Sequence, residues 1–346
     1  GKLLDRQNVK QRIHIANEHN EVKNQRNSPL NEILIKKRQD YIMNPKAVIS
    51  QVPKEYFNIK LGYVLLLHNN IDHVRRLITR IYEPTHYYVI HIDTKASDSY
   101  RDQVQQTVYS LMKKFKVKRQ NVIVMSAYSI TWGGPSMVYA TMEAIKVLTR
   151  EFPDDWDYLL NLSGSDYPLR SNKDIVKELA INAHFLGGKN VSYIDMNLNN
   201  LRDNKSIKLA FTECDDYLYL SGWRPLPRGI DIWTGSQWFV MHNSLTKFFM
   251  HDELIVPKFL RYIENMMVPD ELFFQTIVKA SPFCHNIVNN HLRSIKWRDT
   301  AECFFDRIAD SCGRHPDYFE IDDLPLLQNE KTALFARKFA NDSTLL

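Results

Sequence analysis

Five short apolar runs, rich in β-branched and aromatic residues, follow one another along the chain from residue 61 onward. They are GYVLLLH (62–68), YYVIHID (87–93), NVIVMS (121–126), YLLNLSG (158–164) and WFVM (238–241). Runs of this length and composition are typical of strands buried in the interior of a sheet. We therefore expect a β-strand at each of them.

Between the first four runs, apolar residues recur at the three- and four-residue spacing of a helix that buries one face. One set is Val74, Leu77, Ile78 and Ile81, and another is Met137, Ala140, Ala144 and Leu148. Strands that alternate with such helices form a mostly parallel sheet with helices on both faces. The sequence therefore predicts an α/β fold with a mostly parallel central sheet.

The first 50 residues differ from the rest, because they are polar, basic and rich in Asn and Gln. Apolar residues at helical spacing, such as Leu30 and Ile33, are scattered there. We expect residues 1–58 to form an N-terminal arm or linker, either unstructured or a loosely docked helix, and residues 59–346 to form the folded domain.

The charge of the chain is concentrated in the arm. Nine Lys or Arg and five Asp or Glu fall within residues 1–40, so +4 of the formal net charge of +5 lies there. A nucleic-acid surface would need basic residues clustered on the folded domain. We therefore expect no nucleic-acid partner.

Polar residues collect where the predicted strands end, for example at His68, Asp93 and Asp166. Ligands of open parallel sheets bind beyond the carboxyl ends of the strands. Asp93 is a nucleotide candidate, because its carboxylate can accept hydrogen bonds from two ribose hydroxyls. It is equally typical of a turn-forming aspartate, and both interpretations stay open at this point.

Other motifs are weak when each is taken alone. The common phosphate-binding glycine motifs are absent, and TWGGPS (131–136) suits either a ligand near backbone amides or a plain strand-to-helix connection. Asp155 and Asp157 form an Asp-x-Asp of the kind that can hold a divalent ion. They precede a predicted strand instead of following it, so we expect their carboxylates to point away from the ligand.

The C-terminal third interleaves aromatic residues with polar and charged ones. This composition suits a sugar site, but it also suits an ordinary core with satisfied polar groups. Arg337 and Lys338, in ARKF, could neutralise a diphosphate or form a surface basic pair. VPDELFF (268–274) is typical of a helix start, with Pro269 and two acids in the first turn.

Taken in order, LLLH, HID, TWGG, NLSGSDYP, FTECD, TGSQWF, VPDELFF, NNHLRSIKW and ARKF resemble the core-2/I-branching glycosyltransferases. The resemblance covers about residues 60–340. Within that family, FTECD, SPFCHNIVNNHLRSIKW and the ARKF segment are most similar to the peptide O-xylosyltransferases. The resemblance implies a glycosyltransferase A-type, Rossmann-like fold that acts on a UDP-sugar with inversion.

The resemblance also implies roles for single residues. Glu271 matches the catalytic base, and Asp270 stays a first-turn acid. The residues that would bind the donor are Leu66, His68, Asp93, Lys95, Ile130, Thr131, Trp132, Trp238, Arg337 and Lys338. Asp166 and Gln237 would contact the acceptor or the sugar. Since Arg337 and Lys338 would replace a metal ion at the diphosphate, we expect no metal and no cofactor beside the donor.

The function implied is transfer of xylose from UDP-xylose to a serine of a proteoglycan core protein, which starts a glycosaminoglycan chain. Gln237 stands where xylosyltransferases carry an aspartate and branching enzymes a small residue. A branching-type N-acetylglucosaminyltransferase, or another UDP-sugar transferase acting on a glycan, therefore stays an alternative. A non-catalytic sugar- or nucleotide-binding relative is a third.

Cysteine usage bears on the compartment. The four cysteines show no Cys-x-x-Cys spacing. The resemblance implies a disulfide between Cys303 and Cys312, whereas Cys284 lacks its family partner. A disulfide implies the secretory lumen. We therefore expect a type II membrane protein of the Golgi or endoplasmic reticulum.

The ends of the chain and its sequons fit that compartment. Because the chain begins at Gly1 instead of methionine, we expect its signal-anchor to lie outside this sequence. The further C-terminal domain of xylosyltransferases either was removed here or never existed. Sequons at Asn190, Asn204 and Asn341 suit a glycoprotein, and the one at Asn161 falls in a predicted strand and should be unmodified.

Overall fold

The structure, a computed structural model, describes residues 29–188, 190–197, 205–297, 316–340, 343 and 345. These residues belong to two compact units. The larger unit contains the described residues up to 164 and from 170 to 292. The smaller unit contains residues 165–169 and the described residues from 293 onward.

A seven-stranded sheet in the order β10-β6-β9-β4-β1-β2-β3 forms the centre of the larger unit. Its strands are β1 (Leu61–Leu67), β2 (Tyr87–Ile92), β3 (Val122–Met125), β4 (Tyr158–Ser163), β6 (Ser192–Ile194), β9 (Phe239–His242) and β10 (Ile287–Val288). Neighbours pair in parallel, except that β9 is antiparallel to both β4 and β6. The mostly parallel sheet and the five predicted strands are confirmed, each strand to within one residue.

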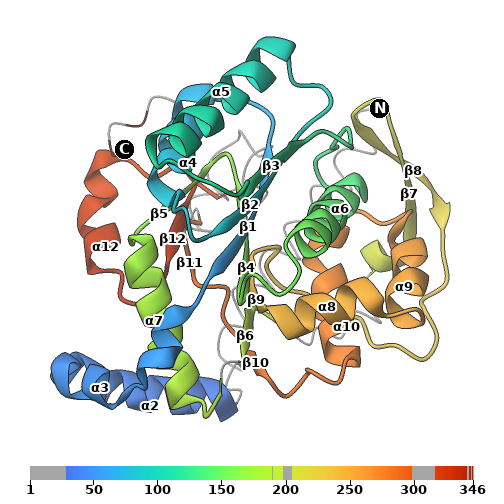
Figure 1. The fold of residues 1–346 in the computed structure, drawn as a ribbon. Coiled ribbons are helices and arrows are strands. Elements are labelled where there is room, and N and C mark those ends of the chain that lie inside the picture. The colour runs from blue at the N-terminus through green and yellow to red at the C-terminus, as the bar shows by residue number, and fades with distance from the viewer. Residues whose placement is uncertain are drawn as a thin grey trace. The chain divides into compact units, whose positions relative to one another are not determined.

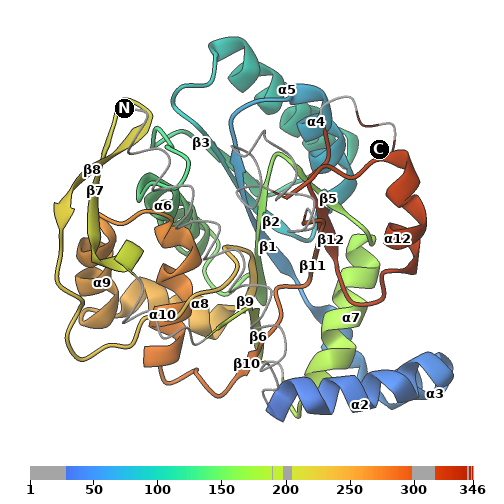
Figure 2. The same cartoon turned by 180° about the vertical axis from the view of Figure 1, so that it is seen from behind.

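Helices cover both faces of this sheet, as Figures 1 and 2 show. On one face lie α4 (Ile71–Ile81) and α5 (Asp98–Lys114). On the other lie α6 (Ser136–Glu151), α8 (Asn243–His251), α9 (Ile255–Ile263) and α10 (Phe273–Ala280). The four apolar residues that predicted the helix after β1 are all buried on α4. The predicted α/β architecture is therefore confirmed.

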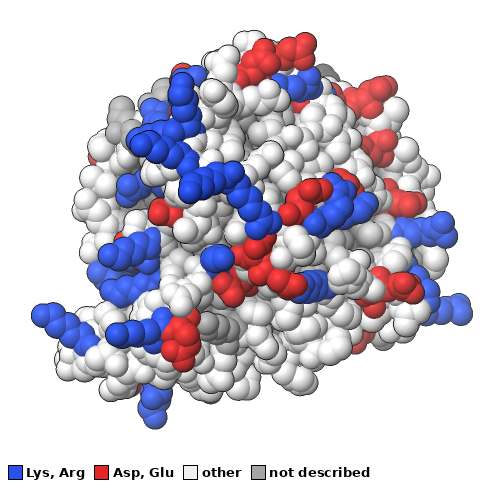
Figure 3. Space-filling model, in the orientation of Figure 1, with Lys and Arg blue, Asp and Glu red and all other residues white. Residues whose placement is uncertain are grey.

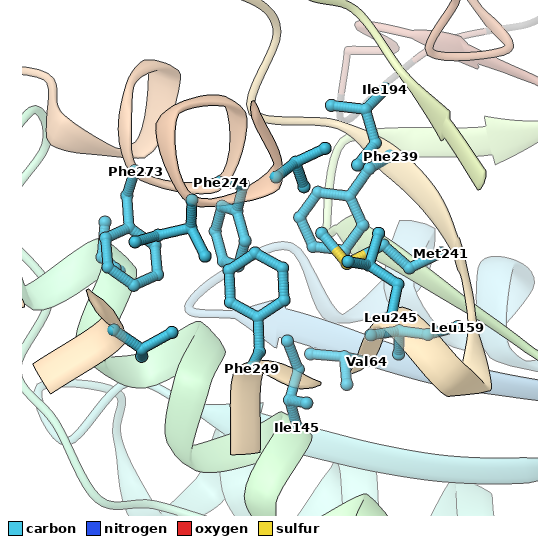
Figure 4. Close-up of a cluster of buried hydrophobic side chains, with 14 of the residues drawn as sticks. Val64, Ile145, Leu159, Ile194, Phe239, Met241, Leu245, Phe249, Phe273 and Phe274 are labelled. Carbon is cyan, nitrogen blue, oxygen red and sulfur yellow. The ribbon is translucent and has the colours of Figure 1, made fainter. Parts of the chain in front are cut away.

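A cluster of buried apolar side chains fills the space between the sheet and α6, α8 and α10 (Figure 4). Phe239 of β9, Phe249 of α8 and Phe274 of α10 meet there. The ring centroid of Phe274 lies 4.7 Å from that of Phe239 and 5.5 Å from that of Phe249. These aromatic residues of the C-terminal third therefore belong to an ordinary core, which was one of the two interpretations left open.

The N-terminal arm is helical from residue 29 onward, with α2 (Pro29–Met43), α3 (Pro45–Gln51) and the 3₁₀ helix η2 (Lys54–Asn58). Val48 and Val52 pack against Ile181 of α7 (Asn172–Phe185), whereas α2 has no buried residue. The side chain of Asn31 on α2 also donates to the Asn289 carbonyl at 3.0 Å and accepts from the Asn289 amide at 2.9 Å, so the arm is docked through both helices. The proposed boundary between residues 58 and 59 stays a prediction.

No helix in the described ranges is both long enough and apolar enough to cross a membrane. Acidic and basic side chains share the face drawn in Figure 3. This mixture agrees with the nearly balanced charge of the chain beyond residue 40.

A two-stranded antiparallel hairpin, formed by β7 (Leu209–Cys214) and β8 (Tyr217–Trp223), belongs to the larger unit but not to its central sheet. Its turn residues Asp215 and Asp216 have φ values of 47° and 67°. Two successive positive φ values are typical of the two-residue turn that joins tightly paired strands. Aspartate tolerates this backbone conformation better than most residues do.

The smaller unit is built on a three-stranded sheet of β5 (Asp166–Pro168), β11 (Arg293–Ile295) and β12 (Phe335–Arg337). The central strand β12 is parallel to β11 and antiparallel to β5. Phe319 and Phe339 form a buried cluster with Ala336. The other elements described in this unit are η6 (Ile321–Asp323) and α12 (Leu324–Asn329). The sequence did not predict these three short strands.

A buried histidine should make the stability of the larger unit depend on pH. The Nδ1 atom of His86 accepts a hydrogen bond from the Leu61 amide at 3.3 Å, and burial lowers the pKa of His86 to about 4. The unfolded chain, with a histidine pKa near ~6.5, then binds the proton more tightly. The free energy of unfolding should therefore fall as the pH drops from about 6.5 to 4, by about 3 kcal/mol from this residue.

Urea unfolding at several pH values between 7 and 4.5 measures this effect. In a His86→Gln variant, the glutamine oxygen can still accept the amide hydrogen bond, but the side chain cannot be protonated. The pH dependence of the variant should therefore be shallower. Identical pH profiles for the variant and the parent chain would contradict the expectation.

Candidate active site

Asp93 directly follows β2, at the edge of the sheet where the parallel strands end, which we call the carboxyl edge. One oxygen of its carboxylate accepts a hydrogen bond from the Lys95 amide at 2.8 Å, and the other accepts one from the Ile130 amide at 3.1 Å. The turn-forming role is therefore present. A carboxylate oxygen can accept a second hydrogen bond, so the ribose role stays a prediction.

Leu66 and His68 lie at the same edge as Asp93. Leu66 is the penultimate residue of β1 and is half-buried, whereas His68 follows the strand and is exposed. The carbonyl of Leu67 accepts a hydrogen bond from the Asp93 amide at 2.8 Å, so β1 and β2 end at the same level. The structure thus brings these three predicted donor residues to one place.

The loop after β3 is held by His91, which we did not single out in the sequence. Its Nε2 atom accepts hydrogen bonds from the amides of Ala127 and Tyr128, each at 3.1 Å. Because this nitrogen accepts, the ring carries its proton on Nδ1, and burial lowers the pKa of His91. His91 and Asp93 together fix the loop that contains Ile130. In the sequence, His91 stands out as a polar residue inside an otherwise apolar strand, two positions before Asp93, and this could have indicated its role.

A pocket of about 570 Å³ opens beside this loop, and both Lys95 and Thr131 line it. The Nζ atom of Lys95 donates to the Ile130 carbonyl at 2.9 Å and forms an ion pair with Asp216 in the hairpin turn. Glu264 contributes a further carboxylate to the lining. The pocket thus joins two predicted donor residues to the tip of the β7–β8 hairpin.

The TWGG turn connects this loop to α6. A carboxylate oxygen of Glu213, on β7, accepts a hydrogen bond from the Ser136 amide in the first turn of α6 at 3.1 Å. A Cβ atom at Gly134 would lie only 2.5 Å from that oxygen, so a larger residue would displace the Glu213 carboxylate. The turn therefore has room for an anionic group beside its backbone amides. In this structure the carboxylate of Glu213 occupies that place. Trp132 beside it is 48% exposed.

Glu271 lies on a short 3₁₀ turn, η5 (Pro269–Glu271), and not on the first turn of α10. The two helices are separated by Leu272, whose φ of −132° departs from helical geometry. The predicted helix start, with Pro269 and both acids in the first turn, is present as this 3₁₀ turn, and α10 begins two residues after Glu271. The amide of Val268 donates to the Gly133 carbonyl at 2.7 Å, which ties the turn to TWGG. Asp270 is buried and Glu271 half-buried.

Residues 233–238, which contain the TGSQW motif, are hydrogen-bonded to the Glu271 region. The Gly235 amide donates to the Glu271 carbonyl at 2.9 Å, and the side chain of Gln275 donates to the Ser236 carbonyl at 2.6 Å. Two motifs that lie about thirty-five residues apart in the sequence thus form one structural piece.

Gln237 and Trp238 extend from this piece toward β9. The Asn161 side chain of β4 donates to the Gln237 carbonyl at 2.8 Å and accepts from the Phe239 amide at 2.9 Å. Gln237 is half-buried, and Trp238 is only 6% exposed. Contacts of Gln237 and Trp238 with a sugar stay predictions. Asn161 is buried in a strand with its amide engaged, so its sequon is inaccessible in the folded chain.

Asp166, Arg337 and Lys338 belong to the smaller unit, where β5 pairs with β12. Asp166 is fully buried, and one of its oxygens lies 3.6 Å from a terminal nitrogen of the Arg337 guanidinium. Lys338 is half-buried, and burial, with a smaller contribution from Arg337, lowers its pKa. Its ammonium has no hydrogen-bond or ion-pair partner within the described residues. The alternative of an exposed surface pair is therefore wrong.

Asp155 and Asp157 precede β4, at the opposite end from the carboxyl edge. Asp155 pairs with Arg119 at 2.8 Å, and a carboxylate oxygen of Asp157 accepts a hydrogen bond from the Lys60 amide at 2.8 Å. Across the ranges that the structure covers, no group of three or more His, Cys, Asp or Glu side chains is placed to hold a metal ion. The metal independence of the protein stays a prediction.

The predicted disulfide between Cys303 and Cys312 lies outside the described residues, as do the sequons at Asn204 and Asn341. Cys214 and Cys284 are free thiols, the first exposed and the second half-buried.

Comparisons with known proteins agree on one family. Residues 61–325 match the family model described as Core-2/I-Branching enzyme. The chain is 30% identical over 312 residues to xylosyltransferase 2 of Canis lupus familiaris, which covers 86% of this chain and 34% of that protein. It is 29% identical over 296 residues to xylosyltransferase 1 of Rattus norvegicus, with coverages of 81% and 34%. The chain thus spans about a third of the length of the curated relatives it matches.

Among solved structures, the apo form of mouse xyloside xylosyltransferase 1 matches with a TM-score of 0.41 and 10% sequence identity. That match covers 82% of this chain and 99% of the mouse chain.

Proposed function

Because the chain belongs to the core-2/I-branching enzyme family, we propose that it is a UDP-sugar-dependent glycosyltransferase. The substrates proposed are UDP-xylose and a serine hydroxyl of a proteoglycan core protein, with inversion at the anomeric carbon and no divalent metal. The observation that carries the proposal is the support of Glu271, whose turn is hydrogen-bonded to both TWGG and residues 233–238. A carboxylate on a turn fixed from two sides suits a general base.

In the proposed reaction, the Glu271 carboxylate removes the proton of the acceptor hydroxyl while its oxygen attacks the anomeric carbon. The bond between that carbon and the diphosphate oxygen breaks, and UDP departs with the electron pair. The attack on the face opposite to UDP inverts the anomeric centre.

Arg337 and Lys338 are proposed to neutralise the charge that develops on the leaving diphosphate. This role rests on the family resemblance and on the state of the two side chains within the smaller unit. A half-buried ammonium that has no hydrogen-bond or ion-pair partner among the described residues is suited to an anionic ligand, because the ligand would replace the lost hydration.

A Lys338→Met variant should bind UDP more weakly, by about 10- to 100-fold, because one charge-assisted interaction is lost. Its thermal stability should be unchanged, since the ammonium has no partner within the described residues. Arg337→Ala should also weaken UDP binding, but it leaves buried Asp166 without its cation and should lower the stability as well. Calorimetric titration with UDP and thermal unfolding separate the two effects. Unchanged UDP affinity in both variants would contradict the role.

Because position 237 is a glutamine, we retain a second candidate function. It is that of a branching-type N-acetylglucosaminyltransferase or another UDP-sugar transferase acting on a glycan. A neutral carboxamide at this position can donate as well as accept hydrogen bonds, unlike the aspartate of xylosyltransferases. Localisation in the Golgi or endoplasmic reticulum, a membrane anchor and the Cys303–Cys312 disulfide also stay predictions of the resemblance.

One experiment distinguishes these functions. A panel of UDP-sugars is offered with a Ser-Gly peptide and with simple glycans in the presence of EDTA, and UDP release and product mass are measured. Xylose on the peptide supports the first function, and another donor and acceptor pair supports the second. UDP binding without turnover of any donor would support a non-catalytic relative. Activity that EDTA abolishes and a divalent ion restores would contradict metal independence.

A further inference from the structure

The β7–β8 hairpin has two edges, and its turn decides which backbone groups point outward. Beside a two-residue turn, the flanking pair Cys214–Tyr217 is hydrogen-bonded, and bonded and non-bonded pairs then alternate. Phe211 on β7, and Leu218 and Leu220 on β8, belong to non-bonded pairs. Their backbone N–H and C=O groups therefore point away from the hairpin.

The outward backbone groups are hydrogen-bonded on the β7 edge and open on the β8 edge. On β7, the Phe211 amide donates to the Asn265 carbonyl at 2.9 Å, and the Phe211 carbonyl accepts from the Asn265 side chain at 3.2 Å. On β8, the backbone groups of Leu218 and Leu220 have no partner in the portion of the chain described. Exposed edges are usually protected by charged residues or proline, but YLYLSGW (217–223) contains neither.

An aromatic surface accompanies the open edge. Tyr217, Tyr219 and Trp223 are 66%, 53% and 71% exposed, and Leu220 is 44% exposed. The ring centroids of Tyr217 and Tyr219 lie 6.4 Å apart in an edge-to-face arrangement. Large exposed aromatic side chains are enriched where proteins recognise partners. Figures 1 and 2 both show β8 as the outer strand of the hairpin.

The hairpin turn places this open edge next to the proposed donor residues. Cys214, Asp215 and Asp216 line the same pocket of about 570 Å³ as Lys95 and Thr131. A strand added along β8 would therefore have one end at that pocket.

We propose that β8 binds the acceptor by strand addition, and that the acceptor is a polypeptide in an extended conformation. This inference rests on the proposed function and specifies the acceptor of the same site. The amides and carbonyls of a polypeptide strand repeat at the spacing of the outward groups of Leu218 and Leu220, whereas the hydroxyls of a glycan do not. A β-bulge opposite Ala210 and Phe211 shifts the register, so Tyr219 and Trp223 lie on opposite faces of the hairpin. Each ring would therefore contact side chains on its own face of the added strand.

The charge at the turn specifies the acceptor further. The carboxylate of Asp215 is exposed at the tip of the hairpin, and Glu264 lines the pocket beside it. Opposite charges favour encounter and fix register across an interface. The preferred acceptor therefore carries Lys or Arg at the end of the added strand that lies beside the pocket.

Two variants test strand addition, and a third is the control. Leu220→Pro removes one outward N–H that has no partner in the structure, and proline is tolerated on the open side of an edge strand. A Tyr219→Ser/Trp223→Ser double variant removes two exposed rings without touching the hairpin hydrogen bonds. Tyr109→Ser removes an equally exposed ring, 68% accessible, from α5.

The measurement is the affinity of a fluorescent Ser-Gly peptide with flanking Lys residues, obtained from fluorescence anisotropy with the full chain. Leu220→Pro should weaken peptide binding about fivefold, as expected for one lost hydrogen bond. The double variant should weaken it about tenfold or more. Tyr109→Ser should leave the peptide affinity unchanged, and UDP affinity should be unchanged in all three variants. If Leu220→Pro unfolds the hairpin, the double variant decides.

The outcomes separate this inference from the proposed function. Peptide affinity that the double variant leaves unchanged would overturn strand addition, as would a wild-type chain that binds a glycan but no peptide. Peptide binding that depends on β8, in a chain that turns over no UDP-sugar, would support strand addition while the proposed function fails. Weaker binding of a peptide with flanking Asp residues would support the charge preference, and equal binding would overturn it.

Discussion

Replacing Glu271 by glutamine is expected to lower the rate of sugar transfer by about 10²- to 10⁴-fold, the usual contribution of a general base. Glutamine keeps the size of the side chain but cannot take the acceptor proton. The backbone groups that hold the turn are unaffected, including the 2.9 Å bond from the Gly235 amide to the Glu271 carbonyl. UDP affinity should therefore stay near that of the parent chain. Single-turnover kinetics and calorimetric titration with UDP measure the two quantities.

Asp270 offers a matched control, because Asp270→Asn makes the same change of charge at the adjacent residue. Asp270 is only 7% exposed, so its substitution should affect the free energy of unfolding and leave the transfer rate within a fewfold of the parent. Near-normal turnover by Glu271→Gln, or an equal loss in Asp270→Asn, would refute the assignment of the base.

A Gly235→Ala variant should be severely destabilised. A Cβ atom at this position would lie 1.7 Å from the backbone oxygen of Asp195, much closer than non-bonded atoms can approach. Overpacking in a core usually costs about 1–3 kcal/mol, and here the obstacle is backbone that cannot rotate away, so we expect about 3 kcal/mol or more. Because the Gly235 amide holds the Glu271 turn, the variant should also lose activity. Urea unfolding measures the loss of stability.

Gly188→Ala is the matched control for this substitution. No atom lies within 4 Å of a Cβ built at Gly188, and its φ is not positive. Its free energy of unfolding should stay within about 0.5 kcal/mol of the parent. A Gly235→Ala chain as stable as Gly188→Ala would show that the segments around Asp195 and Gly235 do not approach as closely as described.

The central sheet could be predicted because strands buried on both faces appear in the sequence as continuous apolar runs. This holds for β1, β2 and β4, and it fails for the short strands of the smaller unit. The segments DYP, RSI and FAR of β5, β11 and β12 are three residues long and contain charged residues. They become strands only because they pair with one another, and this pairing leaves no periodic signal in the sequence.

The candidate site was predictable to a similar extent. The position of Asp93 at the carboxyl edge could be predicted, because a polar residue at the end of a buried strand lies at that edge. The position of Glu271 on a 3₁₀ turn was missed, because it depends on contacts between distant segments. Val268, just before this turn, has a φ of 56°, which is unusual for a β-branched residue. Its bond to the Gly133 carbonyl accompanies this conformation, and no local pattern indicates such a contact.

β9 runs in the opposite direction to β4, and this determines whether the residues at the carboxyl edge precede or follow the strand in the sequence. In the parallel strands β1 and β2, the residues after the strand reach the carboxyl edge. Because β9 runs the opposite way, the residues before it do so, and the bond from Asn161 to the Gln237 carbonyl marks that place. Position 237 is thus outside β9, so a substitution there, including one that alters the proposed contact of Gln237 with the sugar, leaves the pairing of the sheet intact.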